Sequence, residues 1–442
     1  MAGKIKAMWT NKDIRNRILF TLFAFLVYRL GSAITVPDVN TADLVNGLGE
    51  NSLFAMLNLL GGGGLEQFSV FALGVTPYIT ASIIIQLLSM DVIPHLTELS
   101  KAGANGRKTL DKYTRYLAVV FAFVQSFSLV YGFSKTYTSL IVGGVTISKI
   151  LYIATIFAAG SMFLVWIGDQ ISMKGIGNGI SMIIFVGIIS GLPSAVTMIW
   201  DLIFGTGAFS TVGLLTALAI IVGAVLLIAG VVFVQQAERR VPVQYSKKVV
   251  GRKMVGAQNT YIPLKLAMAG VMPVIFASSF MTFPAMLIQI FSPSSIGKSG
   301  FLGGLYQFSI ATSTSQGVGI GYVIANAIIY LLLIIGFTYF YTYATFNPAE
   351  VANTIKKNGG FVPGIRAGKP TSDYIGAVLN KLTLFGGFFL SIIAVIPMFM
   401  RFTSLNLAFG GTAILIVVGV ALETVQQLES QLMIRHYKGF LE

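Results

Sequence analysis

The strongest constraint on the fold is a series of apolar runs, each about 20 residues long and nearly free of charge. A helix needs about 20 apolar residues to cross roughly 30 Å of hydrocarbon. Only 10% of the residues are charged, too few for the surface of a soluble domain. The alternating pattern of a transmembrane barrel is absent. We therefore predict an all-α polytopic membrane protein with ten transmembrane helices, at about 18–36, 68–90, 117–134, 150–168, 178–199, 212–234, 266–290, 320–343, 382–400 and 409–427.

The basic residues orient this bundle. Of the 30 Lys and Arg residues, 25 fall on one side of the predicted spans, and the loop 37–52 on the other side has none. The positive-inside rule makes the basic side cytoplasmic, which places both ends of the chain in the cytoplasm. The basic segment 1–17 precedes a full-length span, so we see no cleavable signal peptide and expect an amphipathic cytoplasmic N-terminus. The segment 428–442 is expected to be a cytoplasmic tail.

Ten spans divide naturally into two halves of five, 18–199 and 200–427. An odd number of spans per half inverts the second half relative to the first, as in proteins with inverted repeats. This is an inference from topology, since similarity between the halves is too weak to assert. The chain has no Cys, which excludes disulfides, Fe–S clusters and Cys-based zinc sites.

Two basic cytoplasmic loops, about 235–265 and 344–381, are longer than a connection requires. The first alternates at Val-Pro-Val-Gln-Tyr and again near 253–258, which predicts a hairpin. The second predicts a short helix that ends at Gly359-Gly360, then an extended stretch rich in Pro and Gly. Both loops could serve only orientation and anionic-lipid contact. Their length favours docking of a large acidic or RNA-bearing partner.

The predicted spans contain almost no ionisable residue besides Arg29 and Glu423, near opposite ends of their spans. Ion-coupled transporters usually carry such residues at membrane depth, and no catalytic motif occurs. A membrane enzyme and a secondary transporter of small solutes are therefore the weaker hypotheses. The core instead places aliphatic pairs four residues apart, Val75 with Ile79 and Ile180 with Ile184. Periodicity alone does not distinguish these pairs from ordinary packing.

Longer motifs are more specific. They include FALGVTPYITASIIIQLL (71–88), MFLVWIGDQISMKGIGNGISMIIFVGI (162–188), AQNTYIPLKLAMAGVMPVIFASSFMTFP (257–284) and FNPAEVANTIKKNGGFVPGIRAGKPT (346–371). In these stretches, and from end to end, the chain resembles the SecY family, the channel-forming subunits of the bacterial protein-export translocon. The resemblance implies two inverted five-helix halves around a central pore, in the bacterial plasma membrane. It also implies a passive channel without cofactor or metal, not an enzyme.

The resemblance assigns a ring of aliphatic side chains to the waist of that pore. Apolar side chains suit this position because a narrow apolar constriction dewets and blocks ions. They also place no hydrogen-bond requirement on the polypeptide that passes. The matching positions in this sequence, here called the ring residues, are Val75, Ile79, Ile180, Ile184, Ile275 and Ile416.

Two further parts of the channel follow from the resemblance. A plug, a half-helix that closes the outer funnel, matches about 53–71, where its residues include Gly61, Gly62, Gly63, Gly64, Leu65, Phe68 and Phe71. The glycine run predicts a mobile plug. A lateral gate, through which apolar segments leave sideways into lipid, matches Thr80, Gln125 and Phe283. For Gln125, a purely structural interhelical hydrogen bond is an equal alternative.

The two basic loops match the family's docking surface for the motor ATPase SecA and for the ribosome. Clustered cations would bind ribosomal RNA phosphate with strong salt dependence. The matching residues are Arg366, Arg239, Arg240, Lys247, Lys248, Arg252 and Lys253. The resemblance also implies the small membrane subunits SecE and SecG as partners, together with signal sequences, nascent or preprotein chains and anionic lipids.

Overall fold

The structure is a computed structural model of the 442-residue chain. It describes residues 9–40, 64–65, 67–90, 93–136, 140–205, 211–245, 248–250, 253–255, 259–291, 300–311, 319–400 and 411–438.

Helices dominate this part of the chain, and every predicted span overlaps one of them. Their bounds are α2 Lys12–Ala33, α5 Thr76–Leu88, α6 Pro94–Lys101, α7 Gly103–Thr136, α8 Ile147–Lys174, α9 Gly179–Ser190, α10 Leu192–Phe204, α11 Thr211–Gln236, α12 Met272–Phe291, α13 Phe301–Ile310, α14 Ile320–Thr345, α15 Pro348–Lys357, α16 Lys369–Met400 and α17 Gly411–Lys438. Among the described residues, six helices are long and apolar enough to cross a membrane, and three apolar helices are shorter. The predicted helical class is confirmed.

Two predicted spans differ in detail from the helices that they overlap. The span predicted from residue 68 becomes helical only at Thr76, with Pro77 in its first turn. Before it, Phe68 and Gly74 have positive φ angles of 47° and 57°, which a right-handed helix excludes. The span predicted at 178–199 is divided at Gly191 into α9 and α10, and Pro193 is the second residue of α10. A proline lacks the N–H that a continuous helix would need there.

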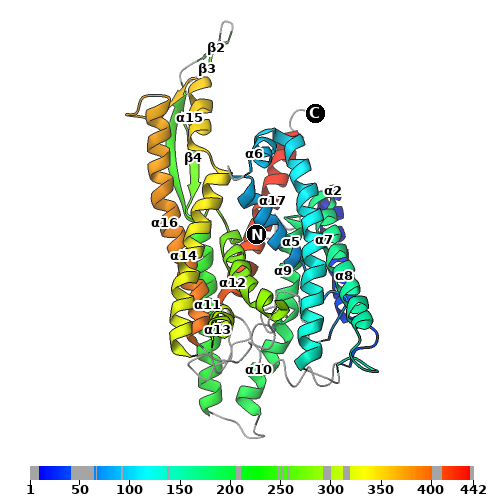
Figure 1. Ribbon diagram of the computed structural model, residues 1–442. Coiled ribbons are helices and arrows are strands. Elements are labelled where there is room, and N and C mark those ends of the chain that lie inside the picture. The colour runs from blue at the N-terminus through cyan, green and yellow to red at the C-terminus, as the bar shows by residue number, and fades with distance from the viewer. Residues whose placement is uncertain are drawn as a thin grey trace.

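The basic loop 235–265 forms a long hairpin, as predicted. Strand β1, Glu238–Tyr245, pairs antiparallel with β4, Asn259–Lys265, and β2, Lys248–Val250, pairs with β3, Lys253–Val255. The second long strand therefore lies a few residues beyond the predicted alternation. The short strand β5, Gly360–Phe361, adds to the other edge of β1 after the predicted helix α15. Figure 1 shows the hairpin projecting from one end of the helix bundle.

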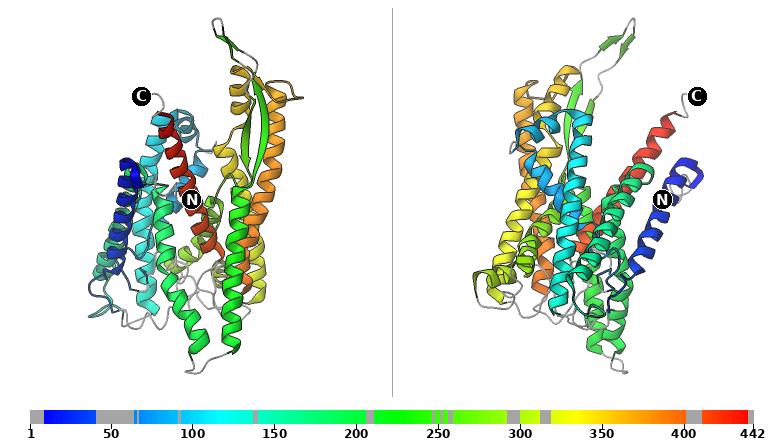
Figure 2. Two further views of the ribbon diagram at one scale, coloured as in Figure 1. Left: turned by 180° about the vertical axis from the view of Figure 1, so that it is seen from behind. Right: turned by 45° about the vertical axis from the view of Figure 1, so that its right-hand side comes forward.

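The helices surround a common apolar core. One hydrophobic cluster takes residues from α2, α5, α8, α9, α11, α12, α14, α16 and α17. In Figures 1 and 2, α7 and α8 lie on one flank and α14 and α16 on the other, while the C-terminal part of α17 points to the hairpin end. Segments far apart in sequence thus meet at the centre of the bundle.

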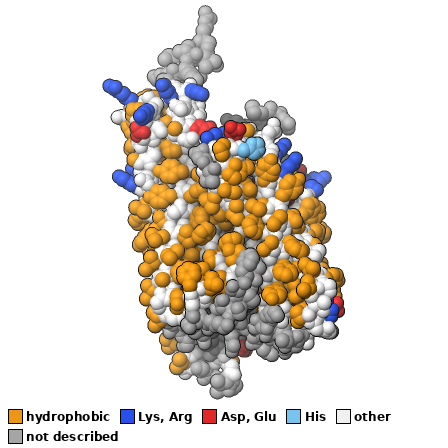
Figure 3. Space-filling model, viewed as in Figure 1, with side chains coloured by type: hydrophobic (Ala, Val, Ile, Leu, Met, Phe, Trp, Pro, Cys, Tyr) orange, Lys and Arg blue, Asp and Glu red, His pale blue; other side chains and the backbone are white. Residues whose placement is uncertain are grey.

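Charge is distributed along the long axis of the molecule. On the face in Figure 3, hydrophobic side chains cover the middle, and Lys and Arg gather mainly at the hairpin end. The exposed apolar side chains include Phe23, Val225 and Phe385, which lie on three different helices. A hydrocarbon surrounding can accommodate such a band, whereas water would oppose it.

Candidate functional site

The six ring residues lie together in the central hydrophobic cluster. Val75 caps the N-terminus of α5 and Ile79 follows one turn later. Ile180 and Ile184 come from α9, Ile275 from α12 and Ile416 from α17. Five of the six are less than 9% exposed, and Ile180 is partly buried. Four helices from both halves of the chain thus contribute aliphatic side chains to one region.

The start of α5 is fixed against α8. The Ser161 hydroxyl donates a hydrogen bond of 2.7 Å to the Gly74 carbonyl. One residue earlier, Gly160 packs so closely on the Val70 carbonyl that a Cβ there would collide with it. These contacts hold the turn before Val75, and through it the position of Val75 and Ile79.

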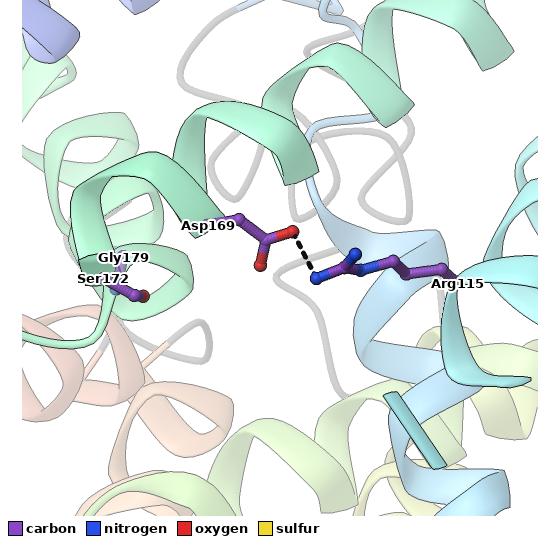
Figure 4. Close-up of polar contacts among 4 residues, drawn as sticks. All are labelled: Arg115, Asp169, Ser172 and Gly179. Atoms are coloured by element: carbon purple, nitrogen blue, oxygen red, sulfur yellow. Dashed lines mark hydrogen bonds and ion pairs between the residues drawn. The ribbon is translucent and has the colours of Figure 1, made fainter. Parts of the chain in front are cut away.

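The start of α9 is also set by contacts with α8. The Asn178 side chain accepts a hydrogen bond from the Ile180 amide, a standard N-cap. The Gly179 amide donates to the Ser172 hydroxyl at 2.9 Å, and both residues are shown in Figure 4. The Gly179 and Gly168 backbones meet without room for a side chain between them. Ile180 and Ile184 therefore take their places from a backbone-to-backbone crossing.

An ion pair that the sequence analysis did not identify joins α7 to α8. Arg115 and Asp169 lie 2.9 Å apart, with side chains 51% and 27% exposed (Figure 4). A carboxylate in a long apolar helix was the available signal, because such residues rarely occur there without a partner. The pair lies one turn from Ser172 and so connects α7 to the part of α8 that supports α9.

The three predicted lateral-gate residues come from α5, α7 and α12, which pack against one another. The Phe283 ring contacts that of Phe121 edge-on, with centroids 6.4 Å apart. Gln125 is one turn from Phe121, on the same face of α7. Its Oε1 atom is buried without a hydrogen-bond partner in the described part of the chain, while the Thr80 hydroxyl donates within α5 to the Thr76 carbonyl. Within the described residues, neither the Gln125 Oε1 atom nor the Thr80 hydroxyl forms a hydrogen bond between two of these three helices.

Part of the predicted plug is described. Gly61, Gly62 and Gly63 lie outside the described residues, whereas Gly64, Leu65, Phe68 and Phe71 belong to a series of turns. The Leu65 and Phe68 side chains are fully buried, and the Phe68 ring packs against Phe133. The Phe71 ring instead stacks on Tyr28 of α2, with centroids 6.2 Å apart. The described end of this segment is thus packed on helices of the N-terminal half.

The predicted docking residues divide between the hairpin and the loop before α16. Arg239 and Arg240 are exposed on β1, and Arg366 is exposed in the loop. The two segments share a small apolar core that includes Val241 and Val362. Strand β2 begins with Lys248 and β3 with Lys253, while Lys247 and Arg252 lie outside the described residues.

Arg240 is held by its neighbours. Its guanidinium pairs with the Glu238 carboxylate at 2.7 Å and lies 4.8 Å from the centre of the Tyr261 ring. The hydrogen bond that Arg240 donates to the Glu238 carboxylate raises the pKa of Arg240 above its usual value. This arginine therefore already has partners within the hairpin.

Comparison with known proteins gives consistent matches. The family model SecY matches residues 69–425. The protein translocase subunits SecY of Halalkalibacterium halodurans and Bacillus subtilis are 43% and 42% identical, each over 97% of this chain and 97% of their own length. A solved structure of a protein-conducting channel superposes with a TM-score of 0.64 at 20% identity, covering 94% of this chain and 92% of that chain. A structure from work on the plug domain of SecY gives 0.65 at 19%, with the same coverage.

Proposed function

This chain belongs to the SecY family, and we propose that it forms the protein-conducting channel of a Sec translocase in a bacterial plasma membrane. In this function, unfolded preproteins cross the membrane through the bundle, and apolar segments leave it sideways into lipid. The channel itself is passive: SecA or a translating ribosome supplies the energy. The hairpin end faces the cytoplasm, together with both termini.

The convergence of six aliphatic ring residues from four helices carries this proposal. The four helices belong to the two sequence halves, α5 and α9 to one and α12 and α17 to the other. A constriction lined only by aliphatic side chains excludes water and ions when no chain is present. Parting the halves would open it, and the same side chains would pack around a polypeptide of any sequence.

The seam between α7 and α12 supports sideways release. Across it the Phe121 ring packs edge-on against Phe283, and the nearby Gln125 Oε1 atom has no hydrogen-bond partner among the described residues. Apolar contacts separate at little cost when lipid replaces them, because lipid is as apolar as the side chains. A client segment rich in Leu, Ile, Phe or Val would then enter lipid with a gain of about 0.3–0.6 kcal/mol per residue.

The exposed arginines at the hairpin end support docking of a partner. Arg366 and Arg239 lie on segments joined by one apolar core, so a partner could contact both together. SecA and the ribosome would then compete for this surface. SecE and SecG would accompany the chain in the membrane, where apolar side chains such as Val212 and Phe233 on α11 are exposed.

Reconstituted export tests the proposed function. We expect vesicles that hold this chain with SecE and SecG to import a preprotein only when SecA and ATP are present. The Arg366→Glu substitution should strongly reduce this import, whereas Lys149→Glu, near the opposite end of the bundle, should leave it unchanged. Import without SecA, or solute uptake coupled to an ion gradient, would contradict the proposal. Import unaffected by Arg366→Glu would refute the docking surface alone.

A further inference from the structure

A polar cavity lies between the α8–α9 turn and α17. Its volume is about 440 Å³. Its lining residues are Ser172, Gly177, Asn178, Ser181, Val420, Glu423, Thr424 and Gln427. Glu423 carries the one carboxyl group among these lining residues, so any negative charge of the cavity comes from it.

The Glu423 carboxylate has no ion pair among the described residues. Lys265, at the end of β4, is the neighbouring cation, but its ammonium group donates a 2.6 Å hydrogen bond to the Gln426 Oε1 atom. The Glu423 Oε1 atom instead lies against the backbone of Gly270, where a Cβ would stand 2.7 Å from it. Gly270 has a φ of 58°, which favours glycine at this position. The Glu423 carboxyl group is thus placed by packing against the Gly270 backbone.

The cavity adjoins the ring. Ser181 follows the ring residue Ile180, and Glu423 lies seven residues after Ile416 on α17, a distance of about 10 Å along a helix. The hydrogen bond between Lys265 and Gln426 shows that the cavity is on the hairpin side of the ring. A chain that enters from that side meets the Glu423 carboxylate just before the aliphatic constriction.

We propose that this cavity binds a Lys or Arg side chain in the basic flank of a client's signal or transmembrane segment. The inference rests on the proposed function and assigns a contact with the client to the entrance of the proposed channel. Secretory signals carry a positively charged region directly before their apolar stretch, and membrane proteins retain such charges on the cytoplasmic side. A cation held by Glu423 would keep the flank on the hairpin side while the apolar stretch reaches the ring and the lateral gate.

The lining favours such a side chain over other ligands. The residues here do not favour a divalent metal, because no group of three or more potential metal-binding residues occurs within the described ranges. An anion would be repelled by Glu423. A Lys or Arg side chain matches both features of the cavity, because its apolar stem can lie along Val420 while its charge reaches Glu423.

Zero-length crosslinking provides the test. A client is stalled in the SecA-driven complex with a single Lys in its flank, and a carbodiimide joins this amine to an adjacent carboxylate with loss of the activating group as a urea. We expect an isopeptide bond to Glu423, identified by mass spectrometry. It should be absent in Glu423→Gln and retained in Glu429→Gln, the matched change further along α17. A crosslink that survives Glu423→Gln would overturn the proposal.

Export of flank variants gives a second readout. Glu423→Gln should lower export of a client with one flanking Lys by about two- to fivefold, the effect of a partly screened ion pair. A client with a neutral flank should be exported equally by both proteins, and Glu423→Lys should favour a client with a flanking Asp. Equal loss for basic and neutral flanks would overturn the cavity assignment but leave the channel function intact. Absence of export for every client, in the unsubstituted complex as well, would overturn the proposed function.

Discussion

In the proposed channel, the side-chain chemistry of the ring residues determines what an idle pore excludes. Ile184 and Ile275 are 2% and 4% exposed within the central cluster. Each contributes only apolar atoms, so water in the constriction would find no hydrogen-bond partner there. The seal proposed here therefore depends on the absence of polar atoms as well as on the fit of the side chains.

Asn in place of Ile184 or Ile275 should make the idle channel conduct ions. The Asn amide offers water a hydrogen-bond donor and an acceptor. Its burial without partners costs about 1–3 kcal/mol, and this cost favours the entry of water into the constriction. Single-channel recording in planar bilayers measures the leak. Ile184→Val and Ile275→Leu keep the site aliphatic and should remain sealed. Conductance unchanged in both Asn variants would argue against these residues as the constriction.

Helical periodicity in the sequence identified two aliphatic pairs, but it did not identify the full set of six ring residues. Val75 with Ile79 and Ile180 with Ile184 follow from helical periodicity, which many packed helices share. Whether these pairs lie beside Ile275 and Ile416 depends on how helices that are distant in sequence pack together. Only the resemblance to a known family suggested this arrangement. The ion pair of Arg115 with Asp169 was missed because 54 positions separate them and no local pattern links them.

The helix ends, by contrast, were partly readable from the sequence. The span predicted from residue 68 becomes helical only at Thr76, next to Gly74 and Pro77, two residue types that interrupt helices. The break between α9 and α10 was missed because Gly191 and Pro193 lie inside a continuous apolar run. The high hydropathy of this run predicted one uninterrupted span despite the proline. Hydropathy measures partition into lipid and does not report where backbone hydrogen bonds stop.

The crossing of α8 with α9 makes one element-level prediction. Gly179→Ala should displace α9, because its Cβ would collide with the Gly168 carbonyl. Overpacking of this kind costs about 1–3 kcal/mol, and the shift of Ile180 and Ile184 should also open an ion leak. Thermal unfolding in micelles and bilayer conductance measure the two effects. Gly223→Ala on α11 is the matched control, since its Cβ meets nothing within 4 Å. Equal behaviour of the two variants would show that the crossing tolerates a methyl group.

At the scale of the whole molecule, the hairpin end differs in chemistry from the bundle. The β1–β4 hairpin, α15 and the start of α16 enclose their own small apolar core. Exposed cations stand on this unit, and β4 leads through a short turn into α12, which carries Ile275. A partner that moves the hairpin would therefore act over a few residues on α12, which carries the proposed ring residue Ile275 and the proposed gate residue Phe283.

Ribosome binding at the hairpin end should weaken as the salt concentration rises. Substitution of Arg239, Arg240 or Arg366 should change this salt dependence by different amounts. Each phosphate contact adds about 0.7–0.9 to the slope of log affinity against log salt concentration. Arg366→Gln and Arg239→Gln should each lower the slope by about that amount. Arg240→Gln should lower it less, because its guanidinium is already engaged by Glu238 and Tyr261. Equilibrium binding of purified ribosomes to the reconstituted complex over a salt series measures these slopes, with Lys149→Gln as the control near the other end. Three equal reductions would mean that the ribosome displaces the hairpin's own contacts, and unchanged slopes would place the docking surface elsewhere.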